Sequence, residues 1–330
     1  MSILLFCLLV LFIIPVSGCV GNESSNMGRA DMTASFTRVT DETAVLEVIN
    51  HPAFEGFGRF LFPTEYRMPG TDMKLNNIGS LLPYHRNINT ETSVEVLNYM
   101  LNEAGKGETI FYDIYTAEEK QSNPSKKNTG LFFFRGKPGE PFAVVCAGGG
   151  FSYVGSIHES FPHALELSKK GYNAFAIQYR TGGAELACED LAAAISFIFR
   201  NAETLKVNTK DYSLWGGSAG ARMAAYIGSY GPAAFGGDNL PRPGAVIMQY
   251  TGHSDYTGNE PPNFAVIGEN DGIASWRTME RRINALKDAG VDTEFHIYPN
   301  LGHGFGLGIG TSAEEWLDKA VRFWEKHILP

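Results

Sequence analysis

A serine between glycines is the stretch of this sequence best suited to covalent chemistry. Trp215-Gly216-Gly217-Ser218-Ala219-Gly220 contains the pattern Gly-x-Ser-x-Gly. The preceding residues are typical of the end of an apolar strand, and Ala221–Tyr226 are typical of the start of a helix. A serine on such a sharp turn has a strained backbone, and its hydroxyl projects toward substrate. A glycine-rich turn with a solvated serine is the alternative, so other residues must decide.

A serine hydroxyl attacks a carbonyl only when a base removes its proton and another group orients that base. His303 is the best candidate among the eight histidines. It lies in the glycine-rich stretch Asn300–Gly306, after the last predicted strand and before the last predicted helix. This placement predicts that His303 is the base, and a loop histidine without a partner is the alternative.

The acid that orients this base should follow the preceding strand. Asp271 comes shortly after the predicted strand Asn263–Gly268, and we favour it for this role. Glu269 is a nearby alternative and Asp255 a more distant one. Asp271 could also be an ordinary residue of an Asp-Gly turn.

An attacking serine also needs hydrogen-bond donors for the negative charge that develops on the carbonyl oxygen. The backbone N–H of Ala219, directly after Ser218, is one expected donor. The loop Ala147–Phe151, which follows the apolar run Pro141–Ala147, should supply the others, because glycines let a backbone approach a substrate closely. A nucleotide-binding loop is disfavoured, because no Lys-Ser/Thr follows and the Gly-x-Gly-x-x-Gly spacing is absent.

Strands and helices alternate through the second half of the chain, which predicts an α/β fold with a mostly parallel sheet covered by helices on both faces. In such sheets the chemistry belongs at the carboxyl ends of the strands. The predicted strands are 141–147, 173–179, 212–215, 245–250, 263–268 and 293–298, and the predicted helices are 160–169, 184–201, 219–229, 274–289 and 312–327.

The residues before this alternating region are harder to interpret. Thr109–Tyr115 and Leu131–Arg135 read as an antiparallel strand pair separated by a polar loop, 117–128. A helix is expected over Thr92–Ala104, with Thr90 as its cap and Gly105 as its end. We expect residues 36–108 to form an extension that packs on or near a catalytic domain, 109–330, and contributes to the pocket rim.

The order Ser218, Asp271, His303 on strand-end loops resembles the α/β-hydrolase superfamily. The triplet Gly148-Gly149-Gly150 resembles the His-Gly-Gly-Gly oxyanion motif of its esterase/lipase branch, but the chain departs at Ala147, where many relatives carry histidine. Residues 109–330 are similar to bacterial acetyl-esterase and acetylxylan-esterase-like members, through Gly148–Phe151, Glu159, Pro162, Gly171-Tyr172 and Tyr179-Arg180.

This resemblance implies roles for further residues. Gly149, Gly150 and Ala219 would form the oxyanion hole. Glu159 is a candidate for a rim or substrate contact, and its alternative role is to cap the following helix. The expected reaction is two-step acyl transfer through an acyl-enzyme, with no metal and no organic cofactor.

Short esters are the expected substrates. The span Tyr250–Pro261 is too short for a large lid, which favours short acyl groups, such as acetyl esters of small molecules or oligosaccharides. Two other classes stay open: a serine peptidase on the same fold, and a non-catalytic binding protein on a hydrolase scaffold. The sequence does not predict the oligomeric state.

The amino terminus predicts export. Ile3–Val16 is an uncharged apolar run that fits a signal peptide, 1–18, although no basic residue precedes it. Val16-Ser17-Gly18-Cys19 resembles a bacterial lipobox, so Cys19 is a lipidation candidate and 19–35 a tether. We expect a lipid anchor at the cell envelope, or otherwise a secreted protein.

Charge and cysteine content narrow the choice of partners. The formal net charge is −9 and no basic run occurs, which disfavours nucleic acid and anionic membrane surfaces as main partners. A membrane contact is expected only through a lipidated amino terminus. Cys146 and Cys188 read as small buried hydrophobic residues, with a bridge between them as the alternative.

Overall fold

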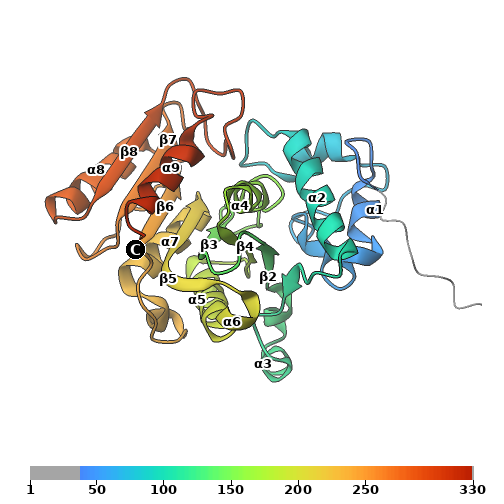
Figure 1. Ribbon diagram of the computed structural model, residues 1–330. Helices are drawn as coiled ribbons and strands as arrows, with labels where there is room; N and C mark the ends of the chain where they lie inside the picture. The colour runs from blue at the N-terminus through green and yellow to red at the C-terminus, as the bar shows by residue number, and fades with distance from the viewer. Residues whose placement is uncertain (1–37, 329–330) are drawn as a thin grey trace, which may run out of the picture. The chain divides into compact units, whose positions relative to one another are not determined.

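The computed structural model describes residues 38–328, so the predicted signal peptide, Cys19 and the tether lie outside the described residues. Eight strands form one sheet in the order β1-β2-β4-β3-β5-β6-β7-β8 (Figure 1). Strands β3 to β8 pair in parallel. Strand β2 is antiparallel to both of its neighbours, β1 and β4. The strands are β1 Phe111–Tyr112, β2 Gly130–Phe134, β3 Pro141–Cys146, β4 Asn173–Gln178, β5 Asn208–Gly217, β6 Ala245–Gln249, β7 Asn263–Gly268 and β8 Thr293–Tyr298.

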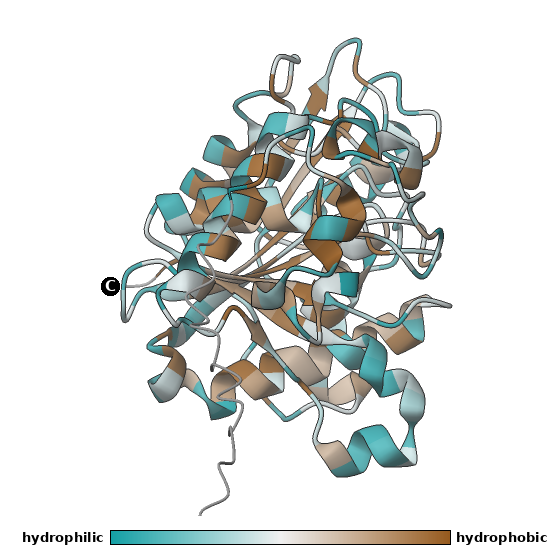
Figure 2. Ribbon diagram, turned by 90° about the vertical axis from the view of Figure 1, so that its right-hand side faces the viewer, coloured by the Kyte–Doolittle hydropathy of each residue, from teal (hydrophilic) through white to brown (hydrophobic). Residues whose placement is uncertain are grey.

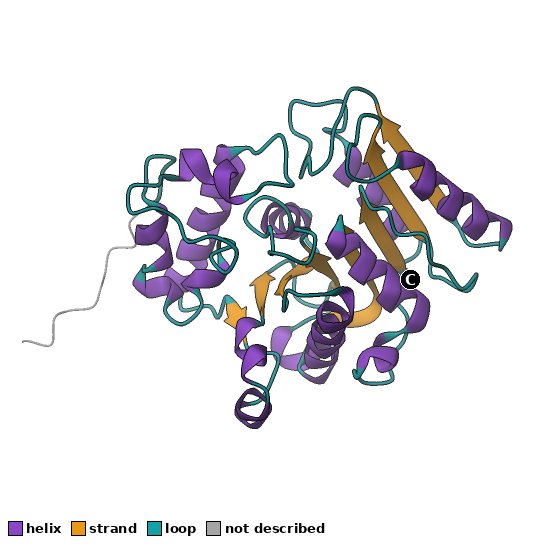
Figure 3. Cartoon of the chain, turned by 180° about the vertical axis from the view of Figure 1, so that it is seen from behind, coloured by secondary structure: helices purple, strands orange, loops and turns teal. Residues whose placement is uncertain are grey.

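Helices cover both faces of the sheet, as predicted (Figure 3). The α-helices are α1 Val45–Ile49, α2 Thr90–Gly105, α3 Ala117–Ser122, α4 Ser160–Lys169, α5 Ala184–Arg200, α6 Ala202–Leu205, α7 Ala219–Tyr230, α8 Trp276–Asp288 and α9 Trp316–Glu325. Short 3-10 helices span Pro52–Phe54, Gly58–Phe60, Leu75–Leu81, Pro124–Asn128 and Pro232–Phe235.

Alternation along β5 decides which helix covers which face. The Trp215 ring lies 6.2 Å from that of Trp316 in α9, whereas a Cβ on the next residue, Gly216, would lie 2.3 Å from the backbone of Gly220 in α7. Because successive side chains of a strand point to opposite faces, α9 and α7 lie on opposite sides of the sheet.

Two strands in the middle of the sheet, β3 and β4, are buried along their whole length. The residues of β3, and those of β4 between Asn173 and Gln178, are apolar or small. A parallel strand covered by helices on both faces is typically buried and apolar in this way. Figure 2 shows the result: brown, hydrophobic strands run through the interior, and teal residues lie on the outer helices.

Two local predictions are wrong. The expected cap of α2 was Thr90, but Asn89 caps the helix, because its Oδ1 accepts from the N–H of Glu91 at 2.8 Å and of Thr92 at 3.2 Å. The expected polar loop 117–128 contains α3 and a 3-10 helix. Thr116 and Glu119 form a reciprocal capping box that starts α3.

Residues 38–108 belong to the same compact unit as the sheet. The Phe57 ring stacks on Phe111 of β1 at 4.7 Å, and it meets Phe132 of β2 edge-on at 5.9 Å. Helix α2 packs against α4. The segment thus covers the sheet edge formed by β1 and β2.

The two cysteines in the described part of the chain do not form a disulfide. Cys146 and Cys188 are both buried and free, so the bridge that the sequence left open does not form. Among residues 38–328, no helix combines the length and apolar character needed to cross a membrane.

Candidate active site

Ser218 lies on a tight turn between β5 and α7. Its backbone has φ 52° and ψ −113°, a left-handed conformation that L-residues rarely adopt. The turn requires glycine on both sides: a Cβ on Gly216 would lie 2.3 Å from Gly220, and a Cβ on Gly220 would lie 2.0 Å from the carbonyl oxygen of Cys146. These close approaches hold the Ser218 side chain out at the carboxyl end of the sheet.

His303 joins Ser218 to Asp271. Its Nε2 lies 3.0 Å from Ser218 Oγ, and its Nδ1 lies 2.7 Å from Asp271 Oδ2. With the proton on Nδ1 donated to the carboxylate, Nε2 is free to accept the serine proton. The His303 side chain is 5% exposed and that of Asp271 0%, so little water competes with these contacts.

Asp271 is held by the turn in which it lies. Its Oδ1 accepts from the N–H groups of Ile273 at 2.8 Å and Ala274 at 2.7 Å, which leaves Oδ2 for His303. The alternative acids lie elsewhere: Asp255 accepts from the Tyr230 hydroxyl, and Glu269 is exposed. Of the three acids, Asp271 is the one in contact with His303.

Three backbone N–H groups near Ser218 lack a protein acceptor. Within residues 38–328, no hydrogen bond pairs the N–H of Gly149, Gly150 or Ala219. The loop is close to the serine, because a Cβ on Gly148 would lie 2.9 Å from the Cβ of Ser218. Gly149 and Gly150 have φ angles of 135° and 61°, which favour glycine. Such unpaired donors can bind a developing oxyanion.

Glu159 does not lie at the rim of the pocket, where the sequence predicted it. It is 1% exposed and lies below the glycine loop. Its Oε2 accepts from the N–H of Gly148, while its Oε1 accepts from the Tyr250 hydroxyl at 2.8 Å and contacts His85 Nε2 at 2.9 Å. The side chain does not cap α4 either. The carboxylate turns inward because these three donors satisfy it there.

The three hydrogen-bond donors around Glu159 determine the pKa of its carboxyl group. Burial raises the pKa of the Glu159 carboxyl, but the charge of His85 and the hydrogen bonds from His85, Gly148 and Tyr250 outweigh burial and lower this pKa to about 2. Glu159 is therefore ionised at neutral pH.

Tyr250 links the glycine loop to the His303 loop. Its hydroxyl accepts from the N–H of Gly306 at 3.3 Å, and its ring lies 4.9 Å from that of His303. Gln249 Nε2 donates to the Gly306 carbonyl at 3.0 Å, and Trp316 Nε1 donates to the same oxygen at 3.1 Å. Three side chains thus fix the loop that carries the imidazole.

The segment Tyr84–Arg86 reaches the site from the amino-terminal side. The N–H of Arg86 donates to the carbonyl of Gly304 at 2.9 Å. A Cβ on Gly150 would lie 3.2 Å from the Tyr84 ring, and Tyr84 is 40% exposed. Tyr84 and His85 could not be predicted from the sequence, because no local pattern indicates that residues 74 or more positions before Glu159 fold against it.

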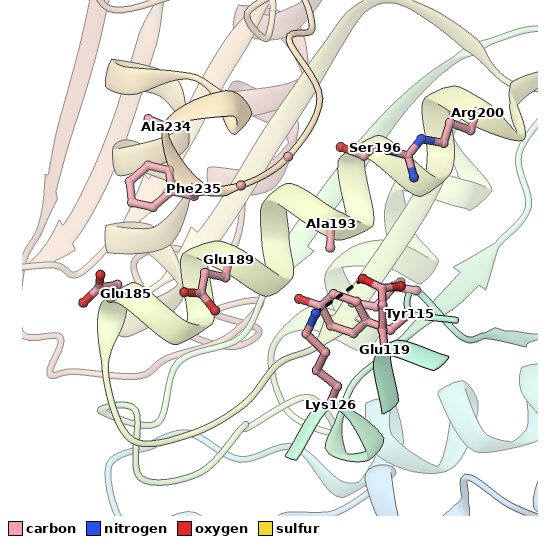
Figure 4. Close-up of a pocket in the computed structure, with 13 residues that line it drawn as sticks. Tyr115, Glu119, Lys126, Glu185, Glu189, Ala193, Ser196, Arg200, Ala234 and Phe235 are labelled. Carbon is pink, nitrogen blue, oxygen red and sulfur yellow. Dashed lines mark hydrogen bonds and ion pairs between the residues drawn. The ribbon is translucent and has the colours of Figure 1, made fainter. Parts of the chain in front are cut away.

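The pocket drawn in Figure 4 is separate from these residues. It has a volume of about 380 Å³ and lies between α5, the connection from β1 to β2, and the 3-10 helix Pro232–Phe235. Lys126 and Glu119 form an ion pair of 3.4 Å at its edge. None of Ser218, His303 and Asp271 lines it. Among the described residues, no cluster of three or more histidine, cysteine or acidic side chains is placed to hold a metal ion.

The sheet order and the serine turn define the α/β-hydrolase fold, and known proteins agree. An alpha/beta hydrolase enzyme from a Medee basin deep-sea metagenome library has a TM-score of 0.53 and 23% identity, covering 61% of this chain and 93% of its own. An acetyl ester-xyloside bifunctional hydrolase from Caldicellulosiruptor lactoaceticus has a TM-score of 0.57 and 20% identity, covering 66% and 95%.

Sequence comparisons point to esterases. The model of the BD-FAE family matches residues 135–240, which include the glycine loop, Glu159 and Ser218. The acetylxylan esterase of Xylanibacter ruminicola is 22% identical over 216 residues, which are 56% of this chain and 45% of that protein. The chain spans less than half the length of the curated relatives it matches. The resemblance to α/β-hydrolase esterases is thereby confirmed.

Proposed function

We propose that this protein is a serine carboxylic-ester hydrolase that acts through Ser218, His303 and Asp271. His303 carries the proposal, because its two ring nitrogens lie 3.0 Å from the serine oxygen and 2.7 Å from the carboxylate. A nucleophile, a base and an orienting acid in this order are what acyl transfer requires.

The reaction proceeds in two steps. His303 Nε2 takes the hydroxyl proton while Ser218 Oγ attacks the carbonyl carbon, and the carbonyl oxygen gains a negative charge. The N–H groups of Gly149, Gly150 and Ala219 bind that oxygen. The imidazolium then gives its proton to the leaving alcohol. Water, activated by His303, hydrolyses the acyl-enzyme and restores Ser218.

Short acyl esters, including acetyl esters of carbohydrates, are the substrates we propose. The connection from β6 to β7 contains no helix that could act as a large lid. The half-exposed Tyr84 ring beside Gly150 offers an apolar face to a ring-shaped alcohol. The similarity to a protein named acetylxylan esterase supports the same substrate class.

Labelling with a fluorophosphonate probe tests the nucleophile. We expect the wild-type protein to be labelled and Ser218→Ala to be unlabelled, with kcat reduced by on the order of 10⁴-fold or more. Ser152→Ala, a change in a neighbouring loop, is the matched control and should be labelled like wild type. An unlabelled wild-type protein would instead favour a binding protein on a hydrolase scaffold.

A series of p-nitrophenyl esters tests the substrate class. We expect kcat/KM to be highest for acetyl and to fall as the acyl chain lengthens. A preference for chains of about ten carbons or more would contradict a short-acyl pocket. Cleavage of dipeptide amides without any preference for esters would assign the protein to serine peptidases.

We also propose that the protein is exported and held at the cell envelope by lipid on Cys19. This rests on the apolar run Ile3–Val16 and the lipobox-like Val16–Cys19. Cys19→Ala should move the protein from the membrane fraction to the soluble fraction. An unchanged distribution, or an intact amino terminus by mass spectrometry, would refute the anchor.

A further inference from the structure

The glycine loop is held by its own backbone and by one buried carboxylate. Ala147 has no polar side chain, and its carbonyl accepts one hydrogen bond, from the Tyr179 hydroxyl at 2.7 Å. The N–H of Gly148 donates to Glu159, and the next two N–H groups are unpaired within the described residues. The Gly148 carbonyl accepts from the N–H of Gly155 at 2.9 Å and the Gly149 carbonyl from that of Ser152 at 3.0 Å, so backbone contacts hold these peptides at one side and the Glu159 carboxylate holds the loop at the other.

The position of Glu159 depends on its donors. A carboxylate that is 1% exposed is stable only when hydrogen bonds and charge replace water. Gly148 is the group being positioned, and Tyr250 supplies a neutral hydroxyl. His85, 3% exposed, is the one side chain among these donors that can bring a positive charge.

His85 is itself fixed on both sides. Its Nδ1 lies 2.8 Å from the Tyr153 hydroxyl, and its Nε2 lies 2.9 Å from Glu159 Oε1. The Tyr153 hydroxyl also accepts from the N–H of Tyr84 at 3.1 Å. Because both ring nitrogens are engaged, the imidazole cannot rotate without breaking a buried contact.

The same short segment touches the loop that carries the base. A Cβ on Gly304 would lie 2.6 Å from the Tyr84 carbonyl oxygen and 2.7 Å from the His85 Cα. The Arg86 N–H donates to the Gly304 carbonyl at 2.9 Å. The segment Tyr84–Arg86 therefore contacts both loops that must act together on one substrate.

We infer that His85 is a positioning residue for the oxyanion hole: by fixing Glu159 it aims the N–H groups of Gly149 and Gly150, so the amino-terminal segment completes the active site. This rests on the proposed function. Residues 38–134 lie outside the family match, which begins at residue 135, so this support comes from a part of the chain that the match does not include.

The test separates transition-state binding from ground-state binding. In His85→Phe, kcat should fall by on the order of 10–10²-fold with KM changed less than about twofold, because displaced donors fail when the oxyanion forms. The Ki of a trifluoromethyl ketone, whose adduct places an oxyanion in the same position, should rise by the factor by which kcat/KM falls. The Ki of the corresponding alcohol should not change.

Two further variants make the test independent of a folding defect. His85→Gln keeps an N–H donor toward Glu159 but brings no charge, and should recover part of the lost kcat. Tyr153→Phe leaves the His85–Glu159 pair but frees Nδ1, and kcat should fall by about 3–10-fold with the same rise in the ketone Ki. Tyr99→Phe is the matched control: it removes a 3.1 Å hydrogen bond from the Arg135 N–H, outside both loops, and should keep wild-type kcat.

The outcomes are distinct. Wild-type kcat in His85→Phe and Tyr153→Phe would overturn the role of His85 while leaving the proposed function intact. Equal losses in ketone and alcohol binding would overturn it too, because they indicate general disorder of the site. A wild-type protein without esterase activity and without labelling at Ser218 would instead reject the proposed function.

Discussion

At the scale of single residues, the side chains of the candidate site form one chain of contacts from acid to imidazole to serine. Asp271 uses one oxygen for its own turn and the other for His303. The side chain of Ser218 contacts the imidazole of His303. Because these three residues act as a unit, each single substitution measures the loss of the unit rather than an additive share.

Asp271→Asn tests the orienting role. The amide oxygen can still accept from Ile273 and Ala274, so the fold should persist, but the amide no longer stabilises the imidazolium. We expect kcat to fall by on the order of 10²–10⁴-fold, measured with p-nitrophenyl acetate. Asp255→Asn and Glu269→Gln are the controls, and a comparable loss in either would contradict the assignment of Asp271.

The sequence predicted these three residues because the nature of each catalytic group is local. A serine between glycines, a histidine in a glycine-rich stretch and an acid after a strand can each be recognised within a few residues. The role of Glu159 could not be predicted in this way. Its direction depends on His85 and Tyr250, 74 positions before it and 91 positions after it.

At the scale of elements, the conformation of the serine turn depends on close contact between the backbones of α7 and β3 rather than on side-chain contacts. Gly220 lets the start of α7 pass over the end of β3, where its missing Cβ would lie 2.0 Å from the Cys146 carbonyl. The strands β7 and β8 and the helix α4 have the predicted bounds. β7 is a buried apolar run, whereas polar and apolar residues alternate in β8.

Gly220→Ala should destabilise this junction. The added methyl group has no space, so we expect the free energy of unfolding to fall by about 1–3 kcal/mol and esterase activity to drop. Gly183→Ala, at a glycine with no heavy atom within 4 Å of an added Cβ, is the control and should be neutral. Urea unfolding measures both, and equal midpoints would contradict the close approach.

Helix α3 is an element that the sequence did not predict, and a short capping pattern holds it. Helix α3 is six residues long and has no buried residue, so apolar periodicity gives no signal there. Its Thr116–Glu119 capping box was the available signal.

At the scale of the whole molecule, buried histidines make stability depend on pH. Burial lowers the pKa of His158 and of His163 to about 4 each, below the ordinary value of about 6.5. Between these values the unfolded chain binds protons that the native chain does not. Stability is therefore full above about pH 6.5 and is lost as pH falls toward 4.

Urea unfolding at pH 7.5 and pH 5 tests this. We expect a lower midpoint at pH 5, and we expect His163→Phe to lose less stability between the two pH values than wild type does. A midpoint independent of pH would contradict the burial of these imidazoles.

The contact between Tyr84–Arg86 and Gly304 bears on how the gene should be trimmed for expression. A clone that starts at residue 135, where the family match begins, would keep the serine, the base and the acid but would lose strands β1 and β2 and the segment that contacts the His303 loop. Loss of esterase activity in such a clone would reflect the missing amino-terminal residues and would not test the role of Ser218.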